Sequence, residues 1–166
     1  MTKRLLLIDG HSMAYRAFFA LPAENFTTAQ GQHTNAIYGF ATMLISLIKE
    51  EKPTHIAVAF DVSRKTFRSD IFPEYKTNRS KTPDEFRSQM SYLHELVSAF
   101  GIQQFEVEGY EADDIIATIT KRAEKDQCEV LICTGDRDSF QLVNSHTTIL
   151  YPKRGVSEMA RMTPQA

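Results

Sequence analysis

The chain has 166 residues, of which 42% are hydrophobic and 24% are charged, and its formal net charge is −2. This composition is that of one globular domain with a hydrophobic core, and no apolar run approaches the roughly 18 residues that a membrane-spanning helix needs. A net charge this low does not suggest a nucleic-acid binder. The charge is unevenly distributed, however, because residues 62–82 are basic and the rest of the chain is acidic.

The first residues resemble a signal peptide only superficially. A short apolar run follows Lys3 and Arg4, but Asp9 ends it, so we predict a first strand over residues 4–8. With no targeting signal, we expect a cytoplasmic protein. Two cysteines at odd spacing, Cys128 and Cys133, should point to opposite faces of one strand and stay reduced and unbridged.

Strands and helices alternate along the predicted chain. Strands are expected at residues 4–8, 54–60, 102–107, 129–133 and 147–151. Helices are expected at residues 11–20, 35–51, 83–100 and 110–126, with a short helical turn at 139–143 and no element in 152–166. The strands are continuously rather than alternately apolar, which favours burial on both faces. We therefore predict an α/β, Rossmann-like parallel sheet of about five strands with helices on both faces, forming one domain over residues 1–166.

Acidic residues gather where this sheet would place a site. Ligands bind at the carboxyl ends of parallel strands, and these ends meet at one edge. Three strands end in acidic motifs, and a helix that follows a fourth strand begins with one. The candidate metal ligands are Asp9, Asp61, Glu111, Asp113, Asp114, Asp136 and Asp138.

The electrostatics of such a cluster favour bound cations. Seven neighbouring carboxylates would repel one another and raise one another's pKa values. Carboxylate oxygens suit Mg²⁺ or Mn²⁺ rather than zinc, and more than four of them suit two metal ions. Such a pair can activate a water and stabilise the leaving oxygen of a phosphodiester.

Each motif has a simpler interpretation when taken alone. A single strand-end aspartate is usually a turn residue, and an acidic helix start, such as Glu111-Ala112-Asp113-Asp114, is usually a cap. Glu111 and Asp114 share a helix face, whereas Asp113 is expected either to reach a metal through water or only to cap. The coincidence of four acidic motifs at one edge favours the metal site.

The basic segment, residues 62–82, begins beside Asp61 and shows no helical or strand period. Its cations would hold phosphates, and Tyr75 or Phe67 could stack on a base. No glycine-rich phosphate loop is present, so a nuclease fits better than a kinase. The candidate DNA-contacting residues are Arg64, Lys65, Arg68, Tyr75, Lys76, Arg79 and Lys81.

Short motifs stand in one order along nearly the whole chain: Leu7-Ile8-Asp9-Gly10-His11-Ser12 with Tyr15-Arg16-Ala17-Phe18, Val58-Ala59-Phe60-Asp61, Phe67-Arg68, Tyr75-Lys76-Thr77-Asn78-Arg79, Thr82-Pro83, Gly109-Tyr110-Glu111-Ala112-Asp113-Asp114, and Thr134-Gly135-Asp136-Arg137-Asp138. This combination resembles the 5′-nuclease domain family of bacterial DNA polymerase I, related to flap endonucleases within the PIN-like superfamily. The resemblance implies that the seven acids hold two Mg²⁺ or Mn²⁺ ions and that residues 62–82 form an arch over the strand.

The resemblance also implies roles and partners. Lys76 and Arg79 match residues that face the phosphate and would offset charge developing during hydrolysis. The substrates implied are DNA 5′ ends and 5′ flaps and RNA–DNA primer junctions, in replication and repair. A polymerase domain is the implied partner if the chain is a fragment.

The chain departs from the family pattern in one respect, and other functions remain open. The family continues into a Gly-Asp-x-x-Asp motif and a duplex-binding helix-hairpin-helix element, which lie beyond Ala166, so we expect an incomplete second metal site. The alternative function is a nucleic-acid-binding module that is weakly active or inactive. A receiver-like signalling domain would need an acidic pair after the first strand, where Asp9 stands alone. A PIN-type ribonuclease shares the acids but usually lacks the long basic arch.

Overall fold

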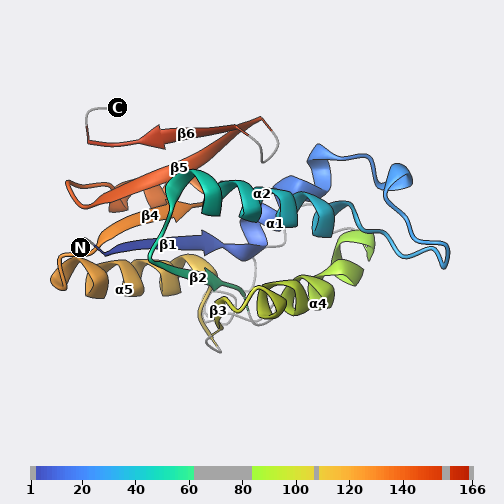
Figure 1. Cartoon of the computed structure of the whole chain (residues 1–166), viewed down its shortest axis with the longest axis horizontal. Helices are drawn as coiled ribbons and strands as arrows, with labels where there is room; N and C mark the ends of the chain where they lie inside the picture. Colours follow the sequence, from blue (N-terminus) through green and yellow to red (C-terminus); the bar gives the residue numbers. More distant parts are fainter. Residues whose placement is uncertain (1–2, 62–83, 107–108, 155–157, 165–166) are drawn as a thin grey trace.

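The computed structural model describes residues 3–61, 84–106, 109–154 and 158–164 (Figure 1). The elements, in chain order, are β1 (Arg4–Asp9), α1 (Gly10–Ala20), the 3-10 helix η1 (Ala23–Asn25), α2 (Asn35–Glu51), β2 (His55–Ala59), α4 (Asp84–Ala99), β3 (Gln103–Phe105), α5 (Ala112–Lys125), β4 (Glu129–Cys133), the 3-10 helix η2 (Arg137–Leu142), β5 (Thr147–Arg154) and β6 (Glu158–Met162). No helix among these described residues is long and apolar enough to cross a membrane.

The strands form one sheet in the order β3-β2-β1-β4-β5-β6 (Figure 1). Neighbouring strands from β3 to β5 are parallel, so the predicted parallel α/β sheet is confirmed. The third strand is shorter than predicted. Since β1 lies between β2 and β4, its carboxyl end occupies the middle of the edge where the acidic motifs were expected.

No element was predicted after residue 151, but the structure has strand residues at 152–154 and 158–162. Strand β5 continues to Arg154, and β6 pairs with it antiparallel as an edge strand. Two side chains of β6 pack on opposite faces of the sheet, Met159 against one core cluster and Met162 against the other. In addition, the guanidinium of Arg161 lies 2.8 Å from both carboxylate oxygens of Glu51 on α2. These long-range contacts, rather than local propensity, define the sixth strand.

Side chains of β1, β2, β4 and β5 alternate between two hydrophobic cores. In β1, Leu6 and Ile8 belong to the core under α1, α2 and α4, whereas Leu7 belongs to the core under α5. Both faces are therefore covered by helices, which explains why the strands are continuously apolar. Cys128 and Cys133 are buried and free, as predicted, but Cys128 lies one residue before β4 rather than on the same strand as Cys133.

The start of α2 is held by a side chain from another helix. Thr34 occupies the N-cap position but makes no side-chain cap bond. Instead, Gln89 Oε1 of α4 accepts hydrogen bonds from the backbone N–H groups of Ala36 and Ile37 at 2.9 and 3.1 Å. Gln89 Nε2 also donates to Asn35 Oδ1 at 2.8 Å. This buried network joins α4, whose first residue is Asp84, to the body of the domain.

Candidate metal centre

Asp9 lies at the centre of the carboxyl edge and is held on both oxygens. It is the last residue of β1 and the N-cap of α1, where its Oδ1 accepts from the backbone N–H of Ser12 at 3.2 Å. Its Oδ2 accepts from the hydroxyl of Thr134 at 3.0 Å. Strand pairing sets Ile8 opposite Cys133, which brings Thr134 beside Asp9. The carboxylate therefore bridges the ends of β1 and β4.

The environment of Asp9 disfavours its negative charge. The residue is 6% exposed. The pKa of Asp9 is raised from 3.8 to about 7, chiefly by burial and also by the charges of Asp61 and Asp113, while its hydrogen bonds to Ser12 and Thr134 oppose the rise. This electrostatic coupling identifies Asp61 and Asp113 as neighbours of Asp9.

Asp61 joins the end of β2 to the start of α5. Its Oδ1 accepts a hydrogen bond from the backbone N–H of Ala112 at 2.7 Å. Ala112 is the first residue of α5, whose N–H has no acceptor within its own helix. Asp61 thereby fixes the acidic helix start against the sheet edge.

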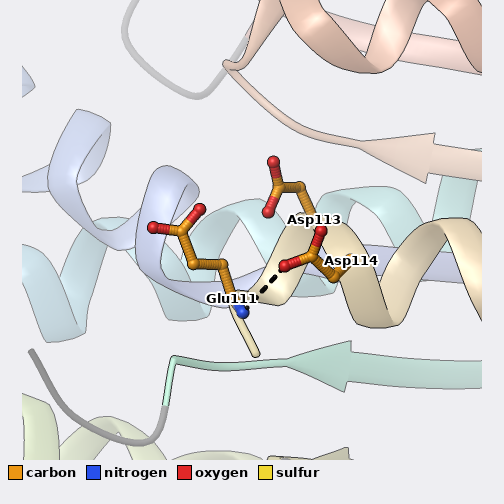
Figure 2. Close-up of side chains that lie close together, drawn as sticks. All are labelled: Glu111, Asp113 and Asp114. Atoms are coloured by element: carbon orange, nitrogen blue, oxygen red, sulfur yellow. Dashed lines mark hydrogen bonds between the residues drawn. The ribbon is translucent and has the colours of Figure 1, made fainter. Parts of the chain in front are cut away.

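The acidic turn brings three carboxylates together. Glu111, Asp113 and Asp114 each offer an oxygen within 4.8 Å of the others. Glu111 is buried, with 7% of its surface exposed. The carboxylate of Asp114 accepts from the backbone N–H of Glu111 at 3.1 Å, as Figure 2 shows. Figure 2 also shows the carboxylates of Glu111 and Asp113 extending beyond the helix start. Asp114 therefore makes a capping contact, a role that was one of the two predicted for Asp113.

The remaining two acids follow β4. Asp136 is half-buried, and its backbone N–H donates to Thr134 Oγ1 at 3.1 Å. Its Oδ1 accepts from the N–H of Asp138 at 2.9 Å, at the start of η2, and Asp138 is exposed. Thr134 thus links Asp136 to Asp9.

Not all seven predicted ligands form one tight group. Within the described part of the chain, Glu111, Asp113 and Asp114 are the only set of three or more potential metal ligands whose donor atoms all lie within 4.8 Å of one another. Asp9 and Asp61 are linked to this group by the Coulomb effect on Asp9 and by the Asp61–Ala112 hydrogen bond. Asp136 is linked to Asp9 through Thr134, and Asp138 is joined to Asp136 by its backbone N–H.

These residues suit a hard divalent cation. The candidate ligands are carboxylate oxygens, the donors that Mg²⁺ and Mn²⁺ prefer. A cation beside Asp9 would also offset the repulsion that helps to raise the pKa of Asp9.

The predicted DNA-contacting residues fall outside the described residues. Nothing in the structure therefore places Arg64, Lys65, Arg68, Tyr75, Lys76, Arg79 or Lys81 relative to the acids. Two hydroxyl residues at the site, Thr134 and Ser12, were not among the predicted site residues. Their proximity to acidic motifs was visible in the sequence, but the atoms that their hydroxyls contact depend on the pairing of β1 with β4.

The chain matches one protein family over nearly its whole length. The family model described as the 5′-3′ exonuclease, N-terminal resolvase-like domain matches residues 4–166. The chain is 57% identical over 162 residues to DNA polymerase I of Mycobacterium bovis and 48% identical over 163 residues to DNA polymerase I of Bacillus subtilis. Each alignment covers 98% of this chain but 18% of the relative, so the chain spans about one fifth of the length of these relatives.

Solved structures share the fold. A flap endonuclease of bacteriophage T5, in a complex with DNA and metal ions, matches with a TM-score of 0.70 at 20% identity, covering 97% of this chain and 58% of that one. The catalytic core of Rad2 in complex with a DNA substrate matches with a TM-score of 0.57 at 18% identity, covering 96% and 47% of the two chains.

Proposed function

Because the chain belongs to the family of 5′-3′ exonuclease N-terminal, resolvase-like domains, we propose that it is the acid-bearing domain of a divalent-metal-dependent 5′ nuclease. Its substrates are DNA phosphodiesters at 5′ ends and flaps, and RNA primers. The observation that carries the proposal is the convergence of Asp9, Asp61 and the acidic turn at the carboxyl edge of the sheet. The domain comprises residues 1–166, with residues 62–82 as a basic arch.

The acids would hold one or two Mg²⁺ or Mn²⁺ ions. Glu111 and Asp113 offer oxygens from one turn, and Asp9 and Asp61 offer oxygens from the adjoining strand ends. Asp136 and Asp138 would offer further carboxylate oxygens from the end of β4. Asp114 would stabilise the acidic turn by accepting the backbone N–H of Glu111. When bound, such ions supply Lewis-acid activation of the phosphodiester and of the attacking water.

The protein residues hold and orient the substrate. The burial of Asp9 keeps bulk water from its carboxylate, which strengthens the electrostatic contacts of that side chain. Lys76 and Arg79 of the arch would neutralise charge on the phosphate as the bond breaks. Arg64, Lys65, Arg68 and Lys81 would contact phosphates along the strand, and Tyr75 would stack on a base.

The relatives are DNA polymerases, so we propose that the nuclease acts beside a polymerase domain in replication and repair. The nuclease would remove the 5′ end or primer that lies ahead of synthesis. This role concerns the longer protein, and its substrate can be tested on the present chain.

The test is cleavage of a duplex that carries a labelled 5′ flap. The wild-type chain should release labelled product only when Mg²⁺ or Mn²⁺ is present, and EDTA should stop the reaction. Asp136→Ala should lower the single-turnover rate by at least about 100-fold. Lys121→Ala on the exposed side of α5 is the matched control and should cleave at the wild-type rate. Undiminished cleavage by Asp136→Ala would exclude the acids from catalysis, and salt-dependent DNA binding without cleavage would favour the binding module.

A further inference from the structure

A closed set of hydrogen bonds surrounds the central carboxylate. Ser12 donates its backbone N–H to Asp9 Oδ1 at 3.2 Å, and Ser12 Oγ accepts the backbone N–H of Gly135 at 2.9 Å. Gly135 follows Thr134, whose hydroxyl donates to Asp9 Oδ2 at 3.0 Å. The ring therefore returns to Asp9 and ties the β1–α1 junction to the end of β4.

The direction of each bond in this ring follows from the groups involved. A backbone N–H only donates, so Thr134 Oγ1 must accept from Asp136 at 3.1 Å. A hydroxyl has one proton, and that proton is then free to point at Asp9. The Thr134 hydroxyl is fully buried, so no water competes for it. Thr134 thus orients the carboxylate of Asp9 and the backbone of Asp136 at the same time.

Gly135 lets the two junctions approach this closely. A Cβ atom at this position would lie 3.0 Å from Ser12 Oγ and 3.5 Å from Arg16 Cγ. The 3.5 Å contact is an ordinary one, but the 3.0 Å contact would push Ser12 Oγ away by a few tenths of an ångström, and the Ser12–Gly135 hydrogen bond would lengthen. The ring therefore depends on a hydroxyl at residue 134, a hydroxyl at residue 12 and the absence of a side chain at residue 135.

We propose that Thr134, supported by Ser12, is a positioning residue that presets the carboxylate of Asp9 for a divalent cation. This inference rests on the proposed function. A carboxylate has about four acceptor positions, and the ring uses two of them, so two remain for a cation. Hydrogen bonds to metal-binding side chains fix their orientation, and removing such a partner typically costs about 10- to 100-fold in metal affinity.

The test compares Mn²⁺ binding by Thr134→Val and Thr134→Ser, measured without DNA from the free Mn²⁺ signal in electron paramagnetic resonance. Valine keeps the shape of threonine but lacks the hydroxyl, whereas serine keeps the hydroxyl. Thr134→Val should bind Mn²⁺ about 10- to 100-fold more weakly than wild type, and Thr134→Ser should bind within about threefold. In flap cleavage with Mn²⁺ well below saturation, Thr134→Val should lower kcat and leave the KM for DNA unchanged.

Controls separate positioning from a loss of folding and from failure of the proposed function. Each variant is titrated below its unfolding temperature, with circular dichroism as the check. Ser12→Ala removes the Gly135 contact but keeps the Ser12 N–H, so its affinity should fall between those of wild type and Thr134→Val. If wild type binds Mn²⁺ and Asp9→Asn weakens that binding, but Thr134→Val binds as wild type does, the inference is wrong while the proposed function stands. If Asp9→Asn binds Mn²⁺ as tightly as wild type, both are wrong.

Discussion

The carboxylate of Asp61 accepts a hydrogen bond from the backbone N–H of Ala112 at 2.7 Å, so the end of β2 is joined to the start of α5. These residues are 51 positions apart in the chain. The contact gives Asp61 a structural role in addition to its proposed metal-binding role. The two roles use different properties of the side chain, an acceptor oxygen and a negative charge, and can be separated by mutation.

Asp61→Ala should destabilise the metal-free chain by about 1 kcal/mol, because the first N–H of α5 loses its acceptor. Asp61→Asn keeps an acceptor oxygen and removes the charge, so it should be at least as stable as wild type in EDTA. Both variants should bind Mn²⁺ more weakly. Urea unfolding and Mn²⁺ titration measure the two effects. Equal stability of the alanine and asparagine variants would show that the hydrogen bond does not anchor α5.

The raised pKa of Asp9 predicts a pH dependence of stability in the absence of metal. Below its ordinary value of 3.8, Asp9 is protonated in both the folded and the unfolded chain. Between that value and about 7, the folded chain keeps the proton that the unfolded chain has lost, so the free energy of unfolding falls as pH rises. The contribution is on the order of 4 kcal/mol, and it is fully lost above the folded pKa.

The measurement compares urea unfolding of wild type and Asp9→Asn in EDTA at pH 5 and pH 8. The stability advantage of the asparagine variant should be larger at pH 8, where wild type must bury a charged carboxylate. The comparison cancels the contributions of other titrating groups that the two proteins share. An advantage that is the same at both pH values would contradict the raised pKa.

Replacing Gln89 should lower the free energy of unfolding more than replacing most other polar residues. Gln89→Leu leaves the N–H groups of Ala36 and Ile37 without their acceptor in a buried site. We expect the free energy of unfolding to fall by roughly 2–4 kcal/mol. Ser91→Leu, on the exposed side of the same helix, is the matched control and should be close to wild type. A Gln89→Leu variant as stable as Ser91→Leu would contradict the network.

Local sequence patterns were sufficient to predict most of the helices and strands. The apolar run of β4 predicted its bounds, residues 129–133, without error, because a strand buried on both faces leaves a continuous hydrophobic signal. Strand β6 left no such signal. It is an edge strand that contains a charged residue, Arg161. The charge of Arg161 is paired with that of Glu51, which lies 110 residues away in the chain. No local pattern contains that pairing.

The site was predictable to a similar extent. The carboxyl ends of parallel strands meet at one edge, so acids that follow strands could be grouped before the structure was known. What the sequence could not provide was the use of each side chain. Asp114 contacts the Glu111 backbone, and Thr134 contacts Asp9, because strand pairing and helix geometry bring those atoms together. Hydroxyl and amide residues, such as Thr134 and Gln89, have no sequence signal that separates a buried hydrogen bond from an exposed side chain.

The most direct test of the metal centre is a crystal of this chain soaked in Mn²⁺, with diffraction measured to locate Mn²⁺ by its anomalous scattering. We predict an anomalous peak at the carboxyl edge, in contact with carboxylate oxygens of Asp9 or Asp61 and of the Glu111–Asp114 turn, and its loss in Asp9→Asn crystals. Intact crystals with no peak there, at a Mn²⁺ concentration that supports flap cleavage, would contradict the account.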